Sequence, residues 1–417
     1  MKRTTGFAVS LLLLAAPLGV SAVSQDDALV GETVVADASP GNEQSIFTSS
    51  ASVSQALPEI VRAKIPPSEI DAASWILMDF GSGWVLGSKH SDQRIEPASL
   101  TKLMTGYLVF EALKAGKIKL QDQAYISKRA WRTSGSKMFV QVDTRVAIGD
   151  LLKGLIIQSG NDAALVLAEH LGGSEEGFAA MMNQKGAELG LANSHFTNPH
   201  GLPDPEHYST ARDLTLLARA IIRDFPEEYK LYSVPEFTYN DITQQNRNIL
   251  LRRDPTVDGV KTGYTAKAGY CLIGSAKRDG MRLLATVTGA RGKIARADAV
   301  QTLLQYGYAN YESMRLYGAD SVVREVPLFM GTVKTAAVGV GQDFGVVFPR
   351  GTQDQLSASL DLPETLDAPL AAGVEAGNMT VKYGGEDLVT QPLRVLRDYP
   401  EGAWWSQGVD SVRRWFY

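Results

Sequence analysis

The chain is poor in cysteine and has no block of basic residues. Its 417 residues include one cysteine, Cys271, and carry a formal net charge of -5. A single thiol excludes an internal disulfide and a cysteine-based zinc site, and the charge pattern gives no indication of nucleic-acid binding. The neighbours Tyr270, Leu272 and Ile273 predict that Cys271 is a buried structural thiol.

Long apolar runs are also missing, except for one near the N-terminus. Lys2 and Arg3 precede an apolar run over residues 7–20, and small residues follow up to Ala22. This order predicts a secretory signal peptide over residues 1–22, cleaved after Ala22. A retained anchor helix is the weaker alternative, because the run is short for crossing a bilayer. We therefore expect the mature protein outside the cytoplasm.

The rest of the chain divides into segments of different composition. Residues 23–57 are rich in Ser, Ala, Asp and Glu, which predicts a flexible leader. Over residues 58–316, strand-like runs before and after a helical middle predict an α/β (α+β) domain with one sheet covered by helices. Residues 320–400 hold short β-prone segments between Gly and Pro turns, which predicts a small all-β domain. Two domains suit this length, since single cores rarely exceed about 300 residues.

Hydrophobic periodicity predicts the individual elements. A β-hairpin is expected over residues 73–87, and a helix opened by Pro97 follows it. Further helices are expected at 148–157, 161–171, 175–189, 211–223 and 295–308. The strands expected between and after them are 257–262, 270–276, 282–288, 332–340, 344–348, 355–360, 379–383 and 391–395.

The last segment, residues 402–417, ends in the aromatic-rich sequence AWWSQGVDSVRRWFY. One face of a helix here would carry Trp405, Val409, Val412 and Phe416. Such a helix is roughly 22 Å long and too charged to cross a bilayer. Trp and Arg are favoured where lipid head groups meet water, so the pattern predicts an amphipathic membrane anchor. A helix docked on the β domain remains the alternative.

A candidate nucleophile lies in the stretch EPASLTKLMT, residues 96–105. In a helix, Ser99 and Lys102 lie on one face about a turn apart, so a hydroxyl and an amine are expected to touch. Ser-x-x-Lys occurs a second time, at Ser134 and Lys137. That copy lies in a Gly- and Ser-rich stretch without apolar periodicity, which predicts a loop.

Two further triplets follow in order along the chain. Ser159-Gly160-Asn161 stands at the start of an expected helix, and Lys261-Thr262-Gly263 stands in an expected strand. Ser-x-x-Lys, Ser-x-Asn and Lys-Thr-Gly, in this order, resemble the signature of the penicillin-recognising serine enzymes.

The chain also resembles one branch of these enzymes, the D-alanyl-D-alanine carboxypeptidases or low-molecular-mass penicillin-binding proteins. The motifs that carry the resemblance are 258–263, 268–270, 200–202, 208–213, 246–248 and, in the β domain, 348–351. It extends from about residue 60 to the end of the chain and implies a serine peptidase without metal or cofactor.

Residue types give the triplets chemical roles. A serine hydroxyl is a poor nucleophile until a neighbouring base takes its proton, and an amine does so only when it is neutral. We therefore assign Ser99 as nucleophile and Lys102 as general base. Burial and a second ammonium, that of Lys261, are expected to lower the pKa of Lys102. Ser159 is expected to relay the proton to the leaving amine.

The remaining residues are expected to bind substrate. Asn161 offers an amide to a substrate peptide bond, and Gly263 allows a substrate to approach the strand closely. The resemblance implies an oxyanion hole made by the backbone N–H groups of Ser99 and Tyr264. It also implies three donors for a terminal carboxylate: Arg247, Lys261 and Thr262.

These assignments predict a serine-type D-Ala-D-Ala carboxypeptidase that trims peptidoglycan stem pentapeptides and is acylated by β-lactams. We expect it in the periplasm, held by its tail on the outer face of the cytoplasmic membrane. A class A β-lactamase is disfavoured, because it needs a loop glutamate and residues 189–203 contain no acid. A D,D-endopeptidase usually lacks the β domain. A non-catalytic wall-binding scaffold would not need the complete set of triplets.

Overall fold

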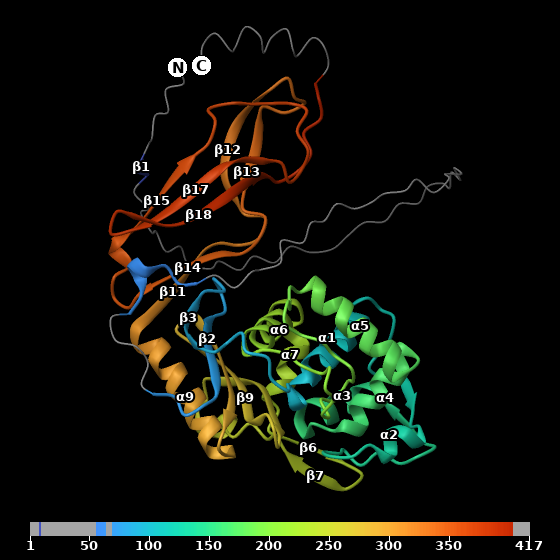
Figure 1. Ribbon diagram of the computed structural model, residues 1–417. Coiled ribbons are helices and arrows are strands. Elements are labelled where there is room, and N and C mark those ends of the chain that lie inside the picture. Colours follow the sequence, from blue (N-terminus) through green and yellow to red (C-terminus); the bar gives the residue numbers. More distant parts are fainter. Residues whose placement is uncertain (1–7, 10–55, 64–68, 403–417) are drawn as a thin grey trace, which may run out of the picture.

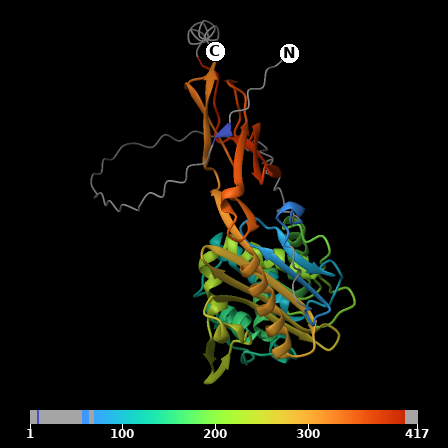
Figure 2. The ribbon, with the colours of Figure 1, turned by 90° about the vertical axis from the view of Figure 1, so that its left-hand side faces the viewer.

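The computed structural model describes residues 8–9, 56–63 and 69–402. The molecule is elongated, with an all-β domain standing on one end of a larger α+β domain (Figures 1 and 2). The predicted cleavage site at Ala22, most of the leader and the tail 403–417 lie outside the described residues, so these predictions stay open. None of the helices in the described ranges has the length and apolar character that a bilayer crossing requires.

The larger domain is built on a five-stranded antiparallel sheet with the order β3-β2-β10-β9-β8. Its strands are β2 (Ser74–Asp79), β3 (Val85–Lys89), β8 (Val257–Thr265), β9 (Gly269–Arg278) and β10 (Met281–Ala290). Every residue of β2 is buried, because helices cover both faces of the sheet. The sheet and its covering helices confirm the predicted fold class. Strand β8, which carries the Lys-Thr-Gly triplet, forms one edge.

Helices cover the two faces unequally. The long helix α9 (Lys293–Asn310) packs on one face, and a cluster of helices covers the other (Figure 1). The longer members of the cluster are α1 (Lys102–Lys114), α4 (Asn161–Gly172), α5 (Glu175–Glu188) and α6 (Ala211–Asp224). The shorter ones are α2 (Lys128–Arg132), α3 (Ile148–Lys153) and α7 (Pro226–Tyr229). The short helix α8 (Leu250–Arg253) lies on the α9 face, where Leu250 belongs to the same apolar core as Val300 and Leu304.

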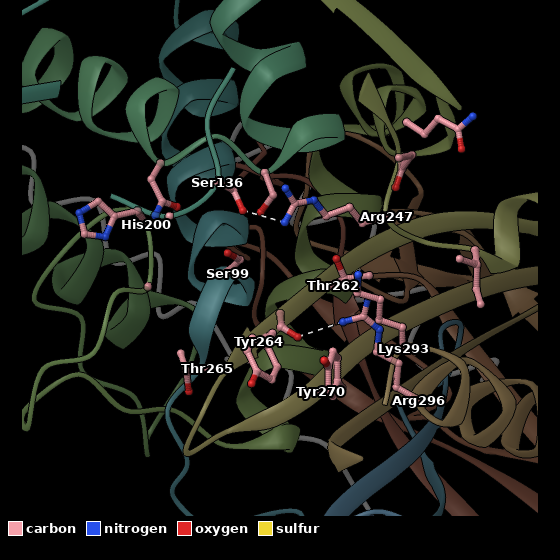
Figure 3. A pocket seen from close by; sticks show the side chains of 18 of the residues that line it. Ser99, Ser136, His200, Arg247, Thr262, Tyr264, Thr265, Tyr270, Lys293 and Arg296 are labelled. Carbon is pink, nitrogen blue, oxygen red and sulfur yellow. Dashed lines mark hydrogen bonds between the residues drawn. The ribbon is translucent and has the colours of Figure 1, made fainter. Parts of the chain in front are cut away.

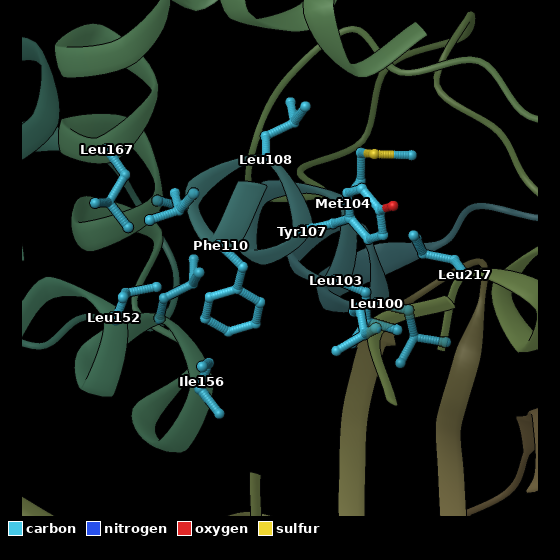
Figure 4. Packing of buried hydrophobic residues seen from close by; sticks show 14 of the residues in the cluster. Leu100, Leu103, Met104, Tyr107, Leu108, Phe110, Leu152, Ile156, Leu167 and Leu217 are labelled. Carbon is cyan, nitrogen blue, oxygen red and sulfur yellow. The ribbon is translucent and has the colours of Figure 1, made fainter. Parts of the chain in front are cut away.

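Helix α1 runs through the middle of the cluster. Residues 102–110 are all buried, so this helix has no solvent face along its first turns. Leu103, Phe110 and their neighbours pack against side chains from several other helices (Figure 4). Each fully buried Leu or Phe contributes about 1.5–3 kcal/mol of transfer free energy. The start of α1 is therefore held firmly, and the site is built there.

One predicted helix differs in detail. The apolar pattern over residues 148–157 predicts a single helix, whereas the structure has α3 followed by a π-helical turn, Gly154–Gln158. The turn ends at Ser159, whose φ of 61° and ψ of 36° are left-handed. This change of direction separates the second triplet from the helix before it.

The β domain contains a seven-stranded sheet with the order β1-β15-β17-β18-β13-β12-β16 and a two-stranded ladder of β11 with β14. The strands are β1 (Ala8–Val9), β11 (Tyr311–Tyr317), β12 (Val322–Phe329), β13 (Thr335–Gly339), β14 (Phe344–Pro349), β15 (Leu356–Asp361), β16 (Leu366–Asp367), β17 (Glu375–Tyr383) and β18 (Glu386–Val395). β11 follows α9 directly and lies between the two domains (Figure 1). Of these, β11 and β12 are strands that the sequence pattern does not predict.

Two small two-stranded sheets complete the larger domain, and neither is predicted from the sequence. They are β4 (Gln123–Tyr125) with β5 (Arg145–Ala147), and β6 (Glu236–Tyr239) with β7 (Ile242–Gln245). Their residues are mostly exposed or half-buried, and each strand has only three or four residues, which is too short a run for a strand prediction.

Candidate active site

Ser99 and Lys102 touch at the entrance to α1. Ser99 lies in a 3-10 turn, Ala98–Thr101, and Lys102 is the first residue of α1. Both residues were expected in one helix starting at Pro97, but the tighter turn brings positions i and i+3 almost above each other. The Nζ atom of Lys102 lies 3.1 Å from Oγ of Ser99.

The Lys102 side chain is 1% exposed and surrounded by three oxygen atoms. Besides Ser99 Oγ, its Nζ donates to Oδ1 of Asn161 and to the carbonyl oxygen of His200, each at 2.7 Å. The two carbonyl oxygens can only accept, and a neutral amine has two N–H bonds and one lone pair. In the neutral form the lone pair therefore points at Ser99 Oγ, the direction that proton abstraction requires.

The electrostatics around Lys102 favour the neutral amine. Burial and then the Arg247 guanidinium lower the pKa of Lys102 to about 7, against the opposing effect of Asp162. Lys261 was expected to be this second cation, but Arg247 takes the role. Burial lowers the pKa of Lys261 well below its usual value, and Lys102, Arg247 and Arg296 lower it further. A basic amine at neutral pH is thus available beside the Ser99 hydroxyl.

Ser159 lies at the same cavity with an uncommitted hydroxyl. Its side chain is buried, and its Oγ has no hydrogen-bond partner among the described residues. A left-handed serine at the end of the π-helical turn is an uncommon conformation that the surrounding structure must hold. The hydroxyl is therefore free to exchange a proton with a bound substrate.

Asn161 is used differently from the prediction. Its Oδ1 accepts from Lys102, and its Nδ2 donates to the Ser134 carbonyl at 2.7 Å. Its backbone N–H donates to the Ser136 carbonyl at 2.6 Å. The amide expected to meet a substrate peptide bond thus bonds to the protein at both ends. It orients the base and fastens the loop that contains the second Ser-x-x-Lys motif.

That second motif is a loop, as predicted, and not a second site. Lys137 Nζ donates to the Trp131 carbonyl at 2.6 Å, and no hydrogen bond among the described residues joins it to Ser134 Oγ. Gly135 and Ser136 line the cavity as one of its walls. Across the cavity, Arg247 donates to Ser136 Oγ at 2.7 Å (Figure 3).

The third triplet lines the opposite wall on the edge strand β8. Thr262, Gly263 and Tyr264 all border the cavity, and Tyr264 is 55% exposed at its rim. The Tyr264 ring packs on Tyr270, with 4.4 Å between ring centroids. Lys261 is 3% exposed and is not among the residues that line the cavity. Its expected contact with a substrate carboxylate therefore stays a prediction.

Two glycines allow the close packing of the backbone just before Ser99. Ala98 has a left-handed φ of 50°, which is strained for a non-glycine residue. A Cβ on Gly201 would lie 1.8 Å from the Ala98 carbonyl oxygen, and one on Gly263 would lie 3.3 Å from both the Ala98 Cβ and the Pro97 oxygen. Gly263 was expected to make room for substrate. The structure gives it another reason, the close approach of β8 to the turn that carries Ser99.

The cavity between these walls has a volume of about 860 Å³. The cations that line it are Arg247, Arg252, Lys293 and Arg296. Among the described residues that line it there is no Asp or Glu. Such a cavity favours a ligand that carries a carboxylate. Lys293 and Arg296, shown in Figure 3, come from α9 and were not predicted, because nothing in their local sequence indicates a site.

A family model for the D-alanyl-D-alanine carboxypeptidases matches residues 60–292. The chain belongs to this carboxypeptidase family. A second model, for the C-terminal domain of penicillin-binding protein 5, matches residues 311–401. The resemblance drawn from the three triplets is thereby confirmed.

Individual members of the carboxypeptidase family agree with this assignment. The D-alanyl-D-alanine carboxypeptidase DacA of Haemophilus influenzae is 40% identical over 362 residues, which cover 84% of this chain and 92% of that protein. The crystal structure of penicillin-binding protein 5 from the same organism has a TM-score of 0.75 at 41% identity, covering 81% of this chain and 100% of that one. Ampicillin-bound penicillin-binding protein D2 from Listeria monocytogenes has a TM-score of 0.54 at 29% identity, covering 58% of this chain and 100% of that one.

Proposed function

We propose that this chain is a serine-type D-Ala-D-Ala carboxypeptidase that removes the terminal D-alanine from peptidoglycan stem pentapeptides. The observation that carries this proposal is the 3.1 Å contact between Ser99 Oγ and the buried amine of Lys102 at the wall of a cationic cavity. Membership of the carboxypeptidase family supports the reaction type and the substrate class.

Acylation begins with the neutral Lys102 amine. It takes the proton of Ser99 as Oγ forms a bond to the carbonyl carbon of the penultimate D-alanine. The carbonyl oxygen becomes an oxyanion, which the backbone N–H groups of Ser99 and Tyr264 stabilise by about 3–4 kcal/mol per donor. Arg247 and Thr262 border the part of the cavity that receives the terminal carboxylate.

The leaving group then departs as D-alanine. The C–N bond breaks, and the amine nitrogen takes a proton that passes from Lys102 through Ser159 Oγ. The product is an ester between Ser99 and the shortened peptide. Water adds to the ester carbonyl with Lys102 again as base, and Ser99 Oγ recovers its proton as the acid is released.

β-Lactams acylate Ser99 by the same reaction, but the resulting ester is hydrolysed slowly. Opening of the lactam ring by Ser99 gives the same kind of ester, and the opened ring stays attached. The ampicillin-bound relative from Listeria supports the binding of a β-lactam at such a site. Residues 189–203 contain no carboxylate to activate a hydrolytic water, so β-lactams act as inhibitors of this chain.

The proposed site of action is the periplasm. The N-terminal pattern of residues 1–22 supports export, and the amphipathic pattern of residues 403–417 supports attachment to the outer face of the cytoplasmic membrane. The β domain then acts as a spacer between the membrane and the catalytic domain. Its position at one end of an elongated molecule is compatible with this arrangement (Figure 2).

The test is release of free D-alanine from a soluble pentapeptide that ends in D-Ala-D-Ala. The wild-type chain and Ser134→Ala are expected to release it at equal rates, and Ser99→Ala to release none. A cross-linked peptide dimer assayed in parallel distinguishes an endopeptidase, which would open the dimer faster than it trims the pentapeptide. Full release by Ser99→Ala would overturn the proposal.

A further inference from the structure

A chain of three polar side chains lies behind the cavity, on the side of His200. Arg129 of α2 forms an ion pair with Glu175, the first residue of α5. The other carboxylate oxygen of Glu175 lies 3.2 Å from Nε2 of His200. Glu175 is 8% exposed and His200 is 6% exposed, so neither is a solvated surface group. Buried polar groups of this kind are held by specific partners.

The hydrogen bonds of the His200 ring fix its tautomer. The backbone N–H of Leu202 donates to Nδ1 of His200 at 3.2 Å, so Nδ1 must be an unprotonated acceptor. The ring proton is then on Nε2 and faces Glu175. Burial lowers the pKa of His200, which agrees with a neutral ring that donates to Glu175. Glu175 thus sets both the tautomer and the orientation of the imidazole.

The same residue contacts the catalytic base through its main chain. The His200 carbonyl accepts from Lys102 Nζ at 2.7 Å. Asn198 Oδ1 accepts from the backbone N–H groups of His200 and Gly201, at 3.3 and 2.7 Å, and closes the loop tightly. A shift of the His200 ring in so short a loop moves its carbonyl, and with it one of the two acceptors that aim the Lys102 lone pair.

Arg129 connects Glu175 to the other wall of the cavity. Helix α2 ends at Arg132, just before the loop whose Ser134 and Ser136 carbonyls accept from Asn161. Asn161 supplies the second acceptor for Lys102. The Arg129–Glu175 pair therefore joins the two segments that hold the two acceptors.

We propose that Glu175 is a positioning residue of this active site, acting through the His200 imidazole to hold the His200 carbonyl against Lys102. The proposal rests on the assignment of Lys102 as the general base. Arg129 keeps the Glu175 carboxylate in place. The function needs a hydrogen-bond acceptor of the right reach at position 175 and does not need its negative charge.

The adjacent Glu176 provides a matched control. An acidic residue in the first turn of a helix stabilises that helix, and this holds for Glu175 and Glu176 alike. Glu176 also bonds to Arg129, at 3.4 Å, but its side chain is 72% exposed and it makes no contact with His200 among the described interactions. A role in helix stability would therefore appear in both positions, and a positioning role only in Glu175.

The experiment compares Glu175→Gln, Glu175→Asp and Glu176→Gln with the wild-type full-length chain. Acylation by a fluorescent penicillin is followed by stopped flow from about pH 5 to pH 9, with thermal unfolding measured alongside. Gln keeps an oxygen within reach of His200 Nε2, whereas Asp keeps the charge and the helix preference but withdraws the oxygen. Asp162, Arg247 and Lys261, the charged groups that act on or beside Lys102, are unchanged in all three variants.

Glu175→Gln is expected to acylate within about threefold of wild type, and Glu175→Asp to be slower by about 10- to 100-fold, because a misplaced base loses that much rate. In Glu175→Asp the apparent pKa of acylation is expected to rise, since a loosened wall admits water to the Lys102 ammonium. Glu176→Gln should match wild type.

Two outcomes overturn the proposal. The first is a Glu175→Asp variant with the wild-type rate and pH profile. The second is the reverse order, with Glu175→Asp active and Glu175→Gln impaired, which would assign the role to charge. Failure of the proposed function is a separate result, because then the wild-type chain itself would not be labelled at Ser99.

Discussion

The amide oxygen of Asn161 accepts a hydrogen bond from Lys102 at 2.7 Å, and the same nitrogen lies 3.1 Å from the Ser99 hydroxyl. Asn161, the asparagine of the Ser-x-Asn triplet, therefore helps to orient the Lys102 amine toward Ser99. Together with the His200 carbonyl, it leaves the lone pair of a neutral Lys102 only one direction, toward the nucleophile.

Acylation is expected to depend on pH through Lys102. Burial and Arg247 lower its pKa to about 7, and the active form is the neutral amine. The rate of penicillin acylation should therefore be constant above neutral pH and fall about tenfold per unit below it. A Lys137→Ala variant, altered in the second Ser-x-x-Lys motif, should show the same profile. A flat profile down to about pH 5 would contradict a neutral lysine base.

Replacement of Ser159 by alanine is expected to lower the activity without lowering the stability. The hydroxyl has no hydrogen-bond partner among the described residues, so its loss removes no bond from the free enzyme. Alanine is also no worse than serine in the left-handed conformation. D-Alanine release should fall by about 100-fold, the lower range for a proton-transfer group, with the melting temperature unchanged. Unchanged release would remove Ser159 from the proton path.

A methyl group at Gly263 is expected to displace the turn that carries Ser99. The added Cβ would lie 3.3 Å from atoms of Pro97, Ala98 and Leu100, so β8 or the turn must shift. Overpacking of this kind costs about 1–3 kcal/mol of unfolding free energy. Gly263→Ala should also acylate at least about tenfold more slowly, because the turn carries Ser99.

Gly341→Ala is the control for this substitution. A Cβ at Gly341 would meet no atom within 4 Å, so its stability and acylation rate should equal those of wild type. Chemical denaturation and stopped-flow labelling measure the two effects. A Gly263→Ala variant with wild-type stability and rate would show that this contact does not position the nucleophile.

Deletion of residues 403–417 is expected to yield an active enzyme that no longer binds membranes. The segment carries the predicted amphipathic helix, whereas the described residues that line the cavity lie between Ser99 and Arg296. Sedimentation with lipid vesicles and D-alanine release measure the two properties on the same preparations. Tight membrane binding by the truncated chain would refute the anchor.

Much of this architecture is predictable from the sequence because it depends on the spacing of residues within single helices and strands. The apolar spacing along α4, α5 and α6 gives their ends to within two residues, and the strand-like runs in β8 to β10 give the core of the sheet. Ser-x-x-Lys is equally local, since its two residues approach each other within one turn. These features need no knowledge of tertiary structure.

The parts that were missed depend on packing between distant segments. Nothing near Lys293 or Arg296 indicates that α9 brings them to the cavity, and nothing near Glu175 indicates a contact with His200. The need for glycine at position 263 likewise comes from a contact with a turn more than a hundred residues earlier in the chain. The strands of the β6–β7 hairpin have only four residues each and none of them is buried, so they give little signal for strand prediction.

The central claim is that Ser99 is the nucleophile, and mass mapping of a penicillin adduct tests it most directly. The full-length chain is incubated with a penicillin, digested and sequenced by mass spectrometry, with Ser134→Ala and Lys102→Ala treated in parallel. We predict one adduct on Ser99 in wild type and Ser134→Ala, and none in Lys102→Ala within the same time. An adduct on Ser134, or none in the wild-type chain, would contradict the account.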